Sequence, residues 1–351
     1  MARAGPRGGT AAAPAPTGRR PAASRRAALA AAALALLAGC AGGGAAPLSV
    51  SQPSAAEAAS AGPQRFALID ADGAPLVADR WPAEGGARVV LLGVHGFGDY
   101  GPSTFGGPAP DWAARGIEVV TYDQRGFGRN PSRGAWPGFE ALTADFAAVA
   151  AQVAAAYPGL PLVAAGHSLG GAVTLAALGA GGAPEVDAAV LLAPATGESV
   201  GPFARAAAWT AAAVIPDRRW SGEGLVRLVP TDNAEALARL RADPAYLRGA
   251  TAREVLGLMY AIERSGDVAA RASLPVLVLH GEKDAVVPYD SVAPVAKALP
   301  RGETILYPDG WHLLLRDNQR ARVWADVAAF ALAQVRPAAI VPAPVVAMEV
   351  R

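Results

Sequence analysis

Gly166-His167-Ser168-Leu169-Gly170-Gly171 follows the apolar run at residues 162–165 and precedes an apolar stretch at residues 172–178. This order predicts a strand, a sharp turn and a helix, with a serine at the turn. The backbone of such a serine is strained, and Gly166 and Gly170 are needed beside it because a side chain would collide with neighbouring backbone. The pattern therefore predicts that Ser168 projects clear of a sheet as a nucleophile, with a helix N-terminus behind it.

Short apolar runs on both sides of this motif predict a mostly parallel sheet. They lie at residues 89–94, 117–122, 162–165, 188–192, 276–279 and 303–307. Continuous apolar runs are typical of strands whose two faces are both covered by helices. Helical patterns, such as residues 142–157 and 320–335, alternate with the runs. We therefore expect an α/β fold with helices on both faces of the sheet, and an antiparallel hairpin at its edge, formed by residues 66–70 and 75–79.

Residues 199–272 interrupt this alternation. They contain no convincing strand but have helix-like stretches at residues 203–215, 233–241 and 252–264. An insertion of this length is expected to form a helical cap over the strand ends. The stretch from Phe203 is apolar nearly all round, and residues 256–262 add another apolar cluster, so these faces either roof a pocket for an acyl chain or pack on the core.

A base must remove the proton of a serine hydroxyl before it can attack a carbonyl. The chain has four histidines, and three of them, His95, His167 and His280, lie in strand-end or elbow motifs. The side chain of His167 is expected to point away from the nucleophile along the chain. His312, in a loop directly after the last predicted strand, is therefore the candidate base.

The base in turn needs an orienting acid, which should lie between the serine and the histidine, just beyond a strand. The segment at residues 280–288 supplies two candidates. Asp284 is preferred to Glu282 because it comes last before the apolar residues 285–288, which fix the loop. The chain order Ser168, Asp284, His312 is the order expected of an α/β-hydrolase.

These motifs, together with His95-Gly96-Phe97-Gly98 and the Asp123-Gln124-Arg125-Gly126-Phe127-Gly128 turn, resemble the monoacylglycerol lipase and lysophospholipase branch of the α/β-hydrolases, often called serine aminopeptidases. The resemblance covers about residues 63 to 336, including the cap and its Asp243-Pro244 segment. It implies a serine esterase that acts on monoacyl lipid esters without a metal or organic cofactor. It also implies an oxyanion hole formed by the backbone N–H groups of Phe97 and Leu169.

Two positions depart from that family's pattern. Asp99-Tyr100 stands where the family often has Glu-His, and Asn130 stands where a Ser usually follows the Arg-Gly-x-Gly turn. Both departures leave the predicted chemistry intact and concern the polar head of the substrate.

One competing motif is Gly96-Phe97-Gly98-Asp99-Tyr100-Gly101, which has the G-x-G-x-x-G spacing of a dinucleotide site, with Asp123 about twenty residues further on. The glycines and prolines at residues 102–110 argue against the helix that would bind the pyrophosphate. The dinucleotide interpretation also leaves the candidate triad unexplained.

The N-terminus predicts export. Residues 1–39 carry six Arg and no acid, and an apolar run ends in Leu37-Ala38-Gly39-Cys40, which resembles a bacterial lipobox. We expect a lipoprotein signal peptide at residues 1–39, lipidation of Cys40 at the cell-envelope membrane and a flexible tether at residues 40–62, with the Sec and twin-arginine routes both open. The tail, residues 337–351, has no assigned role.

Composition excludes further classes of function. The single Cys rules out an intrachain disulfide and a multi-thiolate metal site. Beyond the signal peptide, 25 basic residues stand against 30 acidic ones, which does not predict nucleic-acid binding. Two alternatives to the esterase stay open: a peptidase that holds a substrate ammonium with Glu198, Glu223 or Glu263, and a non-catalytic binding lipoprotein. The oligomeric state is unknown.

Overall fold

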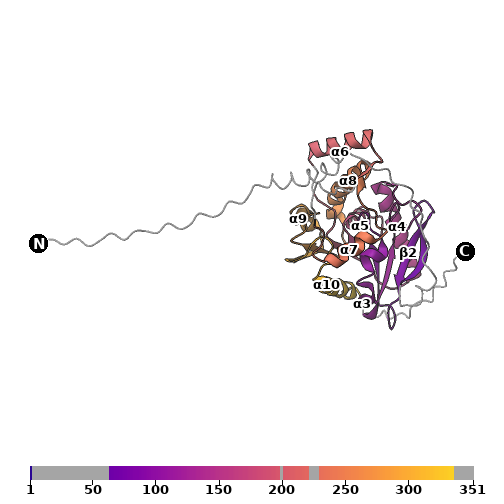
Figure 1. Ribbon diagram of the computed structural model, residues 1–351. Coiled ribbons are helices and arrows are strands. Elements are labelled where there is room, and N and C mark those ends of the chain that lie inside the picture. Colours follow the sequence, from indigo (N-terminus) through magenta and orange to yellow (C-terminus); the bar gives the residue numbers. More distant parts are fainter. Residues whose placement is uncertain (2–62, 198–200, 221–228, 336–351) are drawn as a thin grey trace.

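An eight-stranded sheet forms the centre of the computed structural model (Figure 1). The two strands at one edge are antiparallel to their neighbours, and the remaining strands are parallel. The edge hairpin and the mostly parallel sheet were both predicted, and the prediction is confirmed. In spatial order the strands are β1 (Gln64–Ile69), β2 (Pro75–Trp81), β4 (Ile117–Tyr122), β3 (Val89–Val94), β5 (Leu162–His167), β6 (Ala188–Leu192), β9 (Val276–Gly281) and β10 (Gly302–Tyr307).

The structure describes residue 1 and residues 63–197, 201–220 and 229–335. The predicted signal peptide beyond Met1, the lipidation site Cys40, the tether and the tail lie outside the described residues.

Helices cover both faces of the sheet, as the continuous apolar runs predict. Val90 and Leu92 of β3 face one apolar layer, while Val89 and Leu91 face the other, so every residue of the strand is buried. This confirms the predicted α/β arrangement, with helices on both faces of the sheet. The first layer contains α4 (Phe139–Ala156), α5 (Leu169–Gly179) and α9 (Tyr289–Ala298), and the second contains α2 (Gly101–Phe105), α3 (Ala109–Ala114) and α10 (Arg320–Ala333).

Helix α4 is the one helix of the described residues that is long and apolar enough to cross a bilayer. Its apolar side chains, Leu142, Phe146, Val149 and Val153, are buried in the core beside the sheet. The helix therefore serves as a core helix of the domain.

The segment after β3 differs from its prediction. The glycines and prolines at residues 102–110 were expected to forbid helix, yet α2 and α3 form there, separated by a break at residues 106–108. Each of these helices has a proline in its first two positions, where the missing N–H needs no partner. The prolines thus limit the length of these helices and do not prevent them.

In its described residues, the insertion between β6 and β9 carries three helices: α6 (Pro202–Val214), α7 (Ala234–Ala242) and α8 (Ala252–Val268), followed by the 3₁₀ turn η2 (Ala269–Arg271). A capping box between Thr251 and Glu254 starts α8. The expectation that this insertion has no strand is wrong in one detail, since β7 (Arg219–Trp220) pairs with β8 (Ala250–Thr251).

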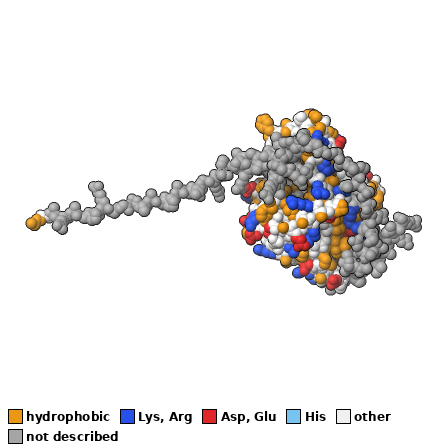
Figure 2. Space-filling view, in the orientation of Figure 1, with side chains coloured by type: hydrophobic (Ala, Val, Ile, Leu, Met, Phe, Trp, Pro, Cys, Tyr) orange, Lys and Arg blue, Asp and Glu red, His pale blue; other side chains and the backbone are white. Residues whose placement is uncertain are grey.

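The outer face of α6 is apolar and exposed. Phe203, Trp209 and Val214 are 91%, 64% and 73% exposed, and Figure 2 shows hydrophobic side chains on the surface at this helix, at the top of the view. The inner face is narrower, with Ala204 and Ala208 packed on a small cluster from β8 and α8. The large apolar side chains of α6 therefore neither roof a pocket nor pack on the core.

Candidate active site

Ser168 lies in a tight turn between β5 and α5. It adopts φ 52° and ψ −116°, a conformation that costs a non-glycine residue about 1–3 kcal/mol. Neighbouring backbone leaves no room for side chains beside it: a Cβ on Gly166 would lie 2.5 Å from the carbonyl oxygen of Gly170, and a Cβ on Gly170 would lie 2.1 Å from that of Val94. Leu169 is the first residue of α5, so its N–H has no acceptor within the helix.

The structure brings the three predicted side chains of the candidate triad together. The hydroxyl of Ser168 lies 3.1 Å from Nε2 of His312, and Nδ1 of His312 lies 2.8 Å from Oδ2 of Asp284. Asp284 and His312 are buried, while Ser168 is partly exposed. In this geometry the Nδ1–H group donates to the carboxylate, which leaves Nε2 free to accept the serine proton.

Asp284 is held as a carboxylate. Its Oδ1 accepts the backbone N–H groups of Val286 and Val287, each at 2.8 Å, in the apolar segment that was expected to fix the loop. Burial would raise the pKa of Asp284, but His312, together with His280 and the N–H of Val287, outweighs it and holds the pKa below its usual value. Glu282 is exposed, so the structure places Asp284, and not Glu282, at the imidazole.

Two of the other histidines brace loops of the site. Nδ1–H of His95 donates to the carbonyl of Gly96 at 2.8 Å, while its Nε2 accepts the N–H of Gln124. Nε2–H of His280 donates to the carbonyl of Val287 at 2.9 Å, in the loop of the candidate acid. Burial lowers the pKa of both rings, so they remain neutral donors at neutral pH.

The expectation that His167 points away is wrong. Its Nε2–H donates to the backbone carbonyl of His312 at 3.0 Å, and the centroids of the two rings are 5.0 Å apart. Burial, with the nearby His312 adding to it, lowers the pKa of His167 to about 3. His167 therefore fixes the backbone of the candidate base. The signal that sequence reasoning missed was its position beside the serine, at the strand end that faces the loop of His312.

The loop after β3 lies directly against the serine. A Cβ on Gly96 would be 3.2 Å from the Cβ of Ser168, so Phe97, the next residue, is beside the nucleophile. The predicted oxyanion donors thus come from two segments that meet here, the loop of Phe97 and the first residue of α5, Leu169.

Two contacts that the sequence did not reveal anchor this loop. The carboxylate of Asp99 forms a buried ion pair with Arg316, four residues after His312. The hydroxyl of Tyr100 donates to Oδ2 of Asp243 in the cap at 2.6 Å. Asp99-Tyr100, one of the departures from the family pattern, therefore joins the loop at residues 95–100 to both the loop of His312 and the cap. We call residues 95–100 the oxyanion loop, after the predicted role of Phe97.

The second departure, Asn130, is structural. Its Nδ2 group donates to the carbonyls of Asp123 and Gln124, and its Oδ1 accepts the N–H of Val77 on β2. The side chain is buried inside the turn, so the expectation that this departure concerns the substrate's polar head is wrong.

The loop of His312 contains one further buried acid. Oδ2 of Asp317 accepts the backbone N–H of Trp311 at 2.7 Å, and burial raises the pKa of this carboxyl to about 6. Because the folded state holds the proton more tightly than the unfolded chain, the contribution of Asp317 to stability is complete at low pH and is lost as the pH rises through about 6.

A cavity of about 500 Å³ lies near Phe97, and part of its lining is apolar or aromatic: Trp136 and, from α8, Leu256, Met259 and Tyr260. Its lining also includes four charged residues, Glu140, Arg205, Arg253 and Glu263. The ring of Phe97 is 6.4 Å from that of Trp136 and also packs on the small cluster between α6 and α8. The oxyanion loop and this cavity therefore share apolar walls.

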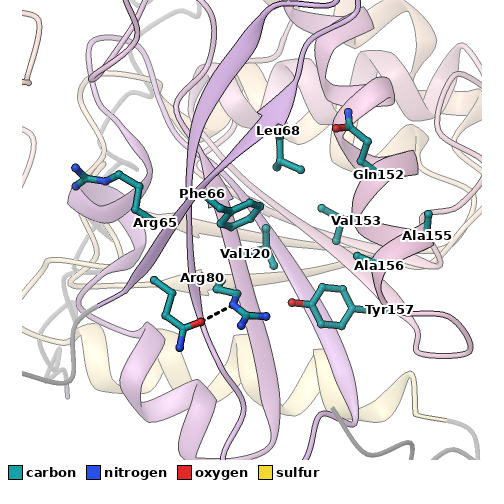
Figure 3. A pocket seen from close by; sticks show the side chains of 11 residues that line it. Arg65, Phe66, Leu68, Arg80, Val120, Gln152, Val153, Ala155, Ala156 and Tyr157 are labelled. Carbon is teal, nitrogen blue, oxygen red and sulfur yellow. Dashed lines mark hydrogen bonds between the residues drawn. The ribbon is translucent and has the colours of Figure 1, made fainter. Parts of the chain in front are cut away.

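A separate cavity of about 400 Å³ lies between the edge hairpin and the end of α4 (Figure 3). Phe66, Val120 and Tyr157 line it, and Arg80 at its side is bound to Gln64. Among the described residues that line it, none belongs to the candidate triad or the oxyanion loop.

The described residues contain no cluster of three or more His, Cys, Asp or Glu side chains that could hold a metal ion.

Known proteins share this fold. The chain is 27% identical over 264 residues to the monoacylglycerol lipase of Mycolicibacterium smegmatis, covering 73% of this chain and 92% of the relative. The monoacylglycerol lipase of Paleococcus ferrophilus superposes with a TM-score of 0.64 at 20% identity, covering 74% of this chain and 98% of that one. A soluble variant of the monoglyceride lipase of Saccharomyces cerevisiae, in complex with a substrate analogue, has a TM-score of 0.64 at 21% identity, covering 80% and 98%.

The sequence profile of the serine aminopeptidase family, S33, matches residues 85–319, which span the elbow and the loops of Asp284 and His312. Together with the mostly parallel sheet covered on both faces, this match shows that the chain belongs to the serine aminopeptidase family, S33, of the α/β-hydrolases.

Proposed function

We propose that the protein is a serine hydrolase that cleaves carboxylic esters, with monoacyl lipid esters such as monoacylglycerols or lysophospholipids as substrates. One observation carries the proposal: His312 lies between the hydroxyl of Ser168 and the carboxylate of Asp284, at 3.1 Å and 2.8 Å. The first distance allows proton transfer from the serine to the imidazole, and the second allows the carboxylate of Asp284 to stabilise the imidazolium that results.

In the first half of the reaction, Ser168 Oγ attacks the ester carbonyl while Nε2 of His312 takes the hydroxyl proton. The carbonyl oxygen becomes an oxyanion, which the N–H groups of Phe97 and Leu169 stabilise. Losing one such donor typically costs about 3–4 kcal/mol of barrier height. The intermediate collapses, His312 returns the proton to the leaving alcohol, and an acyl-enzyme remains.

In the second half, water takes the place of the alcohol. His312 removes a proton from the water, which attacks the acyl carbonyl, and the same N–H groups stabilise the second oxyanion. Collapse breaks the bond to Ser168 Oγ, the serine regains its proton from His312, and the free acid leaves. Asp284 orients the imidazole throughout and stays ionised, which agrees with its lowered pKa.

The apolar surroundings of Phe97 support an acyl substrate. The cavity beside the oxyanion loop is walled by Trp136, Leu256 and Met259, which suit a hydrocarbon chain. The relatives named as monoacylglycerol lipases favour the same class of ester.

A peptidase that releases N-terminal residues is the second candidate, favoured by the family name. It needs an acidic side chain for the substrate ammonium. Glu198 and Glu223 lie outside the described residues, and Glu263 forms an ion pair with Arg205, which offsets its charge. The ester proposal is therefore the better supported of the two.

Comparing substrates on one sample of the full-length protein tests this choice. We expect 1-monooleoylglycerol or a lysophospholipid to be hydrolysed with a kcat/KM at least about a hundredfold above that for an aminoacyl p-nitroanilide, because Trp136, Leu256 and Met259 offer apolar contacts and the charge of Glu263 is offset by Arg205. A higher kcat/KM for the anilide would replace the esterase by the peptidase.

We further propose that the chain is exported and anchored to the cell-envelope membrane through lipidated Cys40, as the Arg-rich start and the lipobox-like Leu37-Ala38-Gly39-Cys40 indicate. We expect the protein to incorporate radiolabelled palmitate in bacterial cells and the Cys40→Ser variant to incorporate none. Equal labelling of the two proteins would exclude anchoring at this residue.

A further inference from the structure

The oxyanion loop is clamped to the cap at residues 243–247. The N–H of Leu247 donates to the carbonyl of Gly98 at 2.7 Å, and the Tyr100 hydroxyl donates to Asp243 at 2.6 Å. Gly98 has φ +77°, and a Cβ there would lie 2.6 Å from the carbonyl oxygen of Leu247. The two segments therefore touch backbone to backbone, on the chain immediately after Phe97.

A second set of contacts also holds the cap segment. The guanidinium of Arg133 donates to the carbonyls of Pro244, Ala245 and Tyr246. The segment is thus bound to the body of the domain through Arg133, and its Asp243 and Leu247 contact the oxyanion loop.

We propose that Tyr100 is a positioning residue of the hydrolase: its hydrogen bond to Asp243 holds the oxyanion loop so that the N–H of Phe97 faces the developing oxyanion. This inference rests on the proposed function. Phe97 and Tyr100 are three residues apart, and the loop between them is joined to the cap at Gly98 and Tyr100. An oxyanion donor must lie about 2.7–3.1 Å from the oxygen, so a small shift of the loop weakens transition-state binding more than substrate binding.

Tyr100 can be tested more cleanly than its neighbour Asp99. Removing Asp99 would leave Arg316 as an unpaired charge in a buried site, which destabilises a protein for reasons unrelated to catalysis. The ring of Tyr100 is held independently by Arg129, whose guanidinium lies 5.1 Å from the ring centroid. Tyr100→Phe therefore keeps the ring in place and removes only the hydroxyl that reaches the cap.

Four variants of the full-length protein separate positioning from stability. Tyr100→Phe and Asp243→Ala each break the contact. Asp243→Asn preserves it, because the amide oxygen can accept the N–H of Ala245 while its nitrogen donates to the Tyr100 hydroxyl. Tyr157→Phe is the matched control, since Tyr157 makes an equivalent 2.7 Å hydrogen bond to Glu118, beside the cavity of Figure 3 and away from the oxyanion loop.

Two inhibitors give the readout. An alkyl boronic acid forms a tetrahedral adduct with a nucleophilic serine and reports transition-state binding. A non-hydrolysable monoalkyl glycerol ether reports ground-state binding. For Tyr100→Phe and Asp243→Ala we expect kcat to fall about tenfold and the boronate inhibition constant to rise about tenfold, while KM and ether binding stay within about twofold. Combining the two substitutions should add no further loss. Asp243→Asn should restore wild-type values, and Tyr157→Phe should change only the unfolding temperature.

The inference is overturned if Tyr100→Phe binds the boronate as tightly as wild type does, or if boronate and ether binding weaken together, which would make Tyr100 a substrate contact or a structural residue. A wild-type protein that neither turns over an ester nor binds the boronate would instead refute the proposed function itself, and this inference with it.

Discussion

Replacing Ser168 with alanine is expected to lower kcat for a monoacyl ester by about 10⁵- to 10⁶-fold, the loss typical of removing a serine nucleophile. The substitution deletes the hydroxyl that acts as the nucleophile in the proposed mechanism, while His312 and Asp284 stay paired. The residual rate should come from binding and the oxyanion donors alone. Release of free acid from monooleoylglycerol, followed at substrate saturation, measures the change.

A control on folding accompanies this result. The substitution removes one hydrogen bond, between the Ser168 hydroxyl and the imidazole of His312. Serine and alanine carry the same backbone strain at φ 52°, so we expect the unfolding temperature to change by only a few degrees. A fluorophosphonate probe should label the wild-type protein and leave the alanine variant unlabelled. Turnover above about 1% of wild type in the variant would refute the acyl-enzyme mechanism, and failure of the probe to label wild type would favour the binding lipoprotein.

Gly170→Ala is expected to have the largest effect on folding, with a loss of more than about 4 kcal/mol in the free energy of unfolding. The new Cβ would lie 2.1 Å from the carbonyl oxygen of Val94 and 2.5 Å from that of His95. Both are backbone atoms at the end of a central strand, so neither can move without displacing the sheet or α5. Thermal unfolding should show a decrease of about 10 °C or more, or the variant should be recovered only as aggregate.

Gly182→Ala provides the comparison. Gly182 lies just beyond the C-terminal end of the same helix, and its Cβ would meet only the carbonyl oxygen of Ala177, at an ordinary 3.5 Å. We expect its unfolding temperature to stay within about 2 °C of wild type, because alanine restricts the unfolded chain and meets no clash. Equal losses at both positions would show that close packing at the elbow is not the cause.

The sheet could be predicted because its central strands are buried on both faces, which forces a continuous apolar run such as Val89–Val94 on the sequence. The short helices α2 and α3 could not be predicted. Proline breaks a helix at an interior position but suits its first turn, so the same residues support opposite predictions until the length of the helix is known.

The positions of the three candidate catalytic side chains could be predicted because each follows a strand or ends one, and parallel strands bring those ends to one edge. The contacts that hold the surrounding loops together could not be predicted. Arg316 meets Asp99 across 217 positions of the chain, and Tyr100 meets Asp243 across 143, and no local pattern encodes either distance. The direction of the His167 ring could not be predicted either, because its acceptor, the carbonyl of His312, lies 145 positions further along the chain.

The helices of the cap could be predicted from the sequence, but the side of α6 that faces solvent could not. The composition of α6, rich in Ala with Phe203, Trp209 and Val214, does not show which side faces the domain. The structure turns the small residues Ala204 and Ala208 inward, because only small side chains allow the close approach of α6 to α8. Close packing of α6 on α8 therefore sets the orientation of α6, although burial of its larger side chains would itself be favourable.

The three buried histidines that hold backbone carbonyls limit the stability of the fold at acidic pH. Burial keeps His95, His167 and His280 neutral, and their lowered pKa values mean that the unfolded chain takes up protons near pH 6.5 while the folded chain does not. Their contribution to stability is complete above that pH and is lost as the solution is acidified. A variant adapted to acid surroundings would thus have to exchange these three imidazoles for amides or hydroxyls able to hold the same carbonyls.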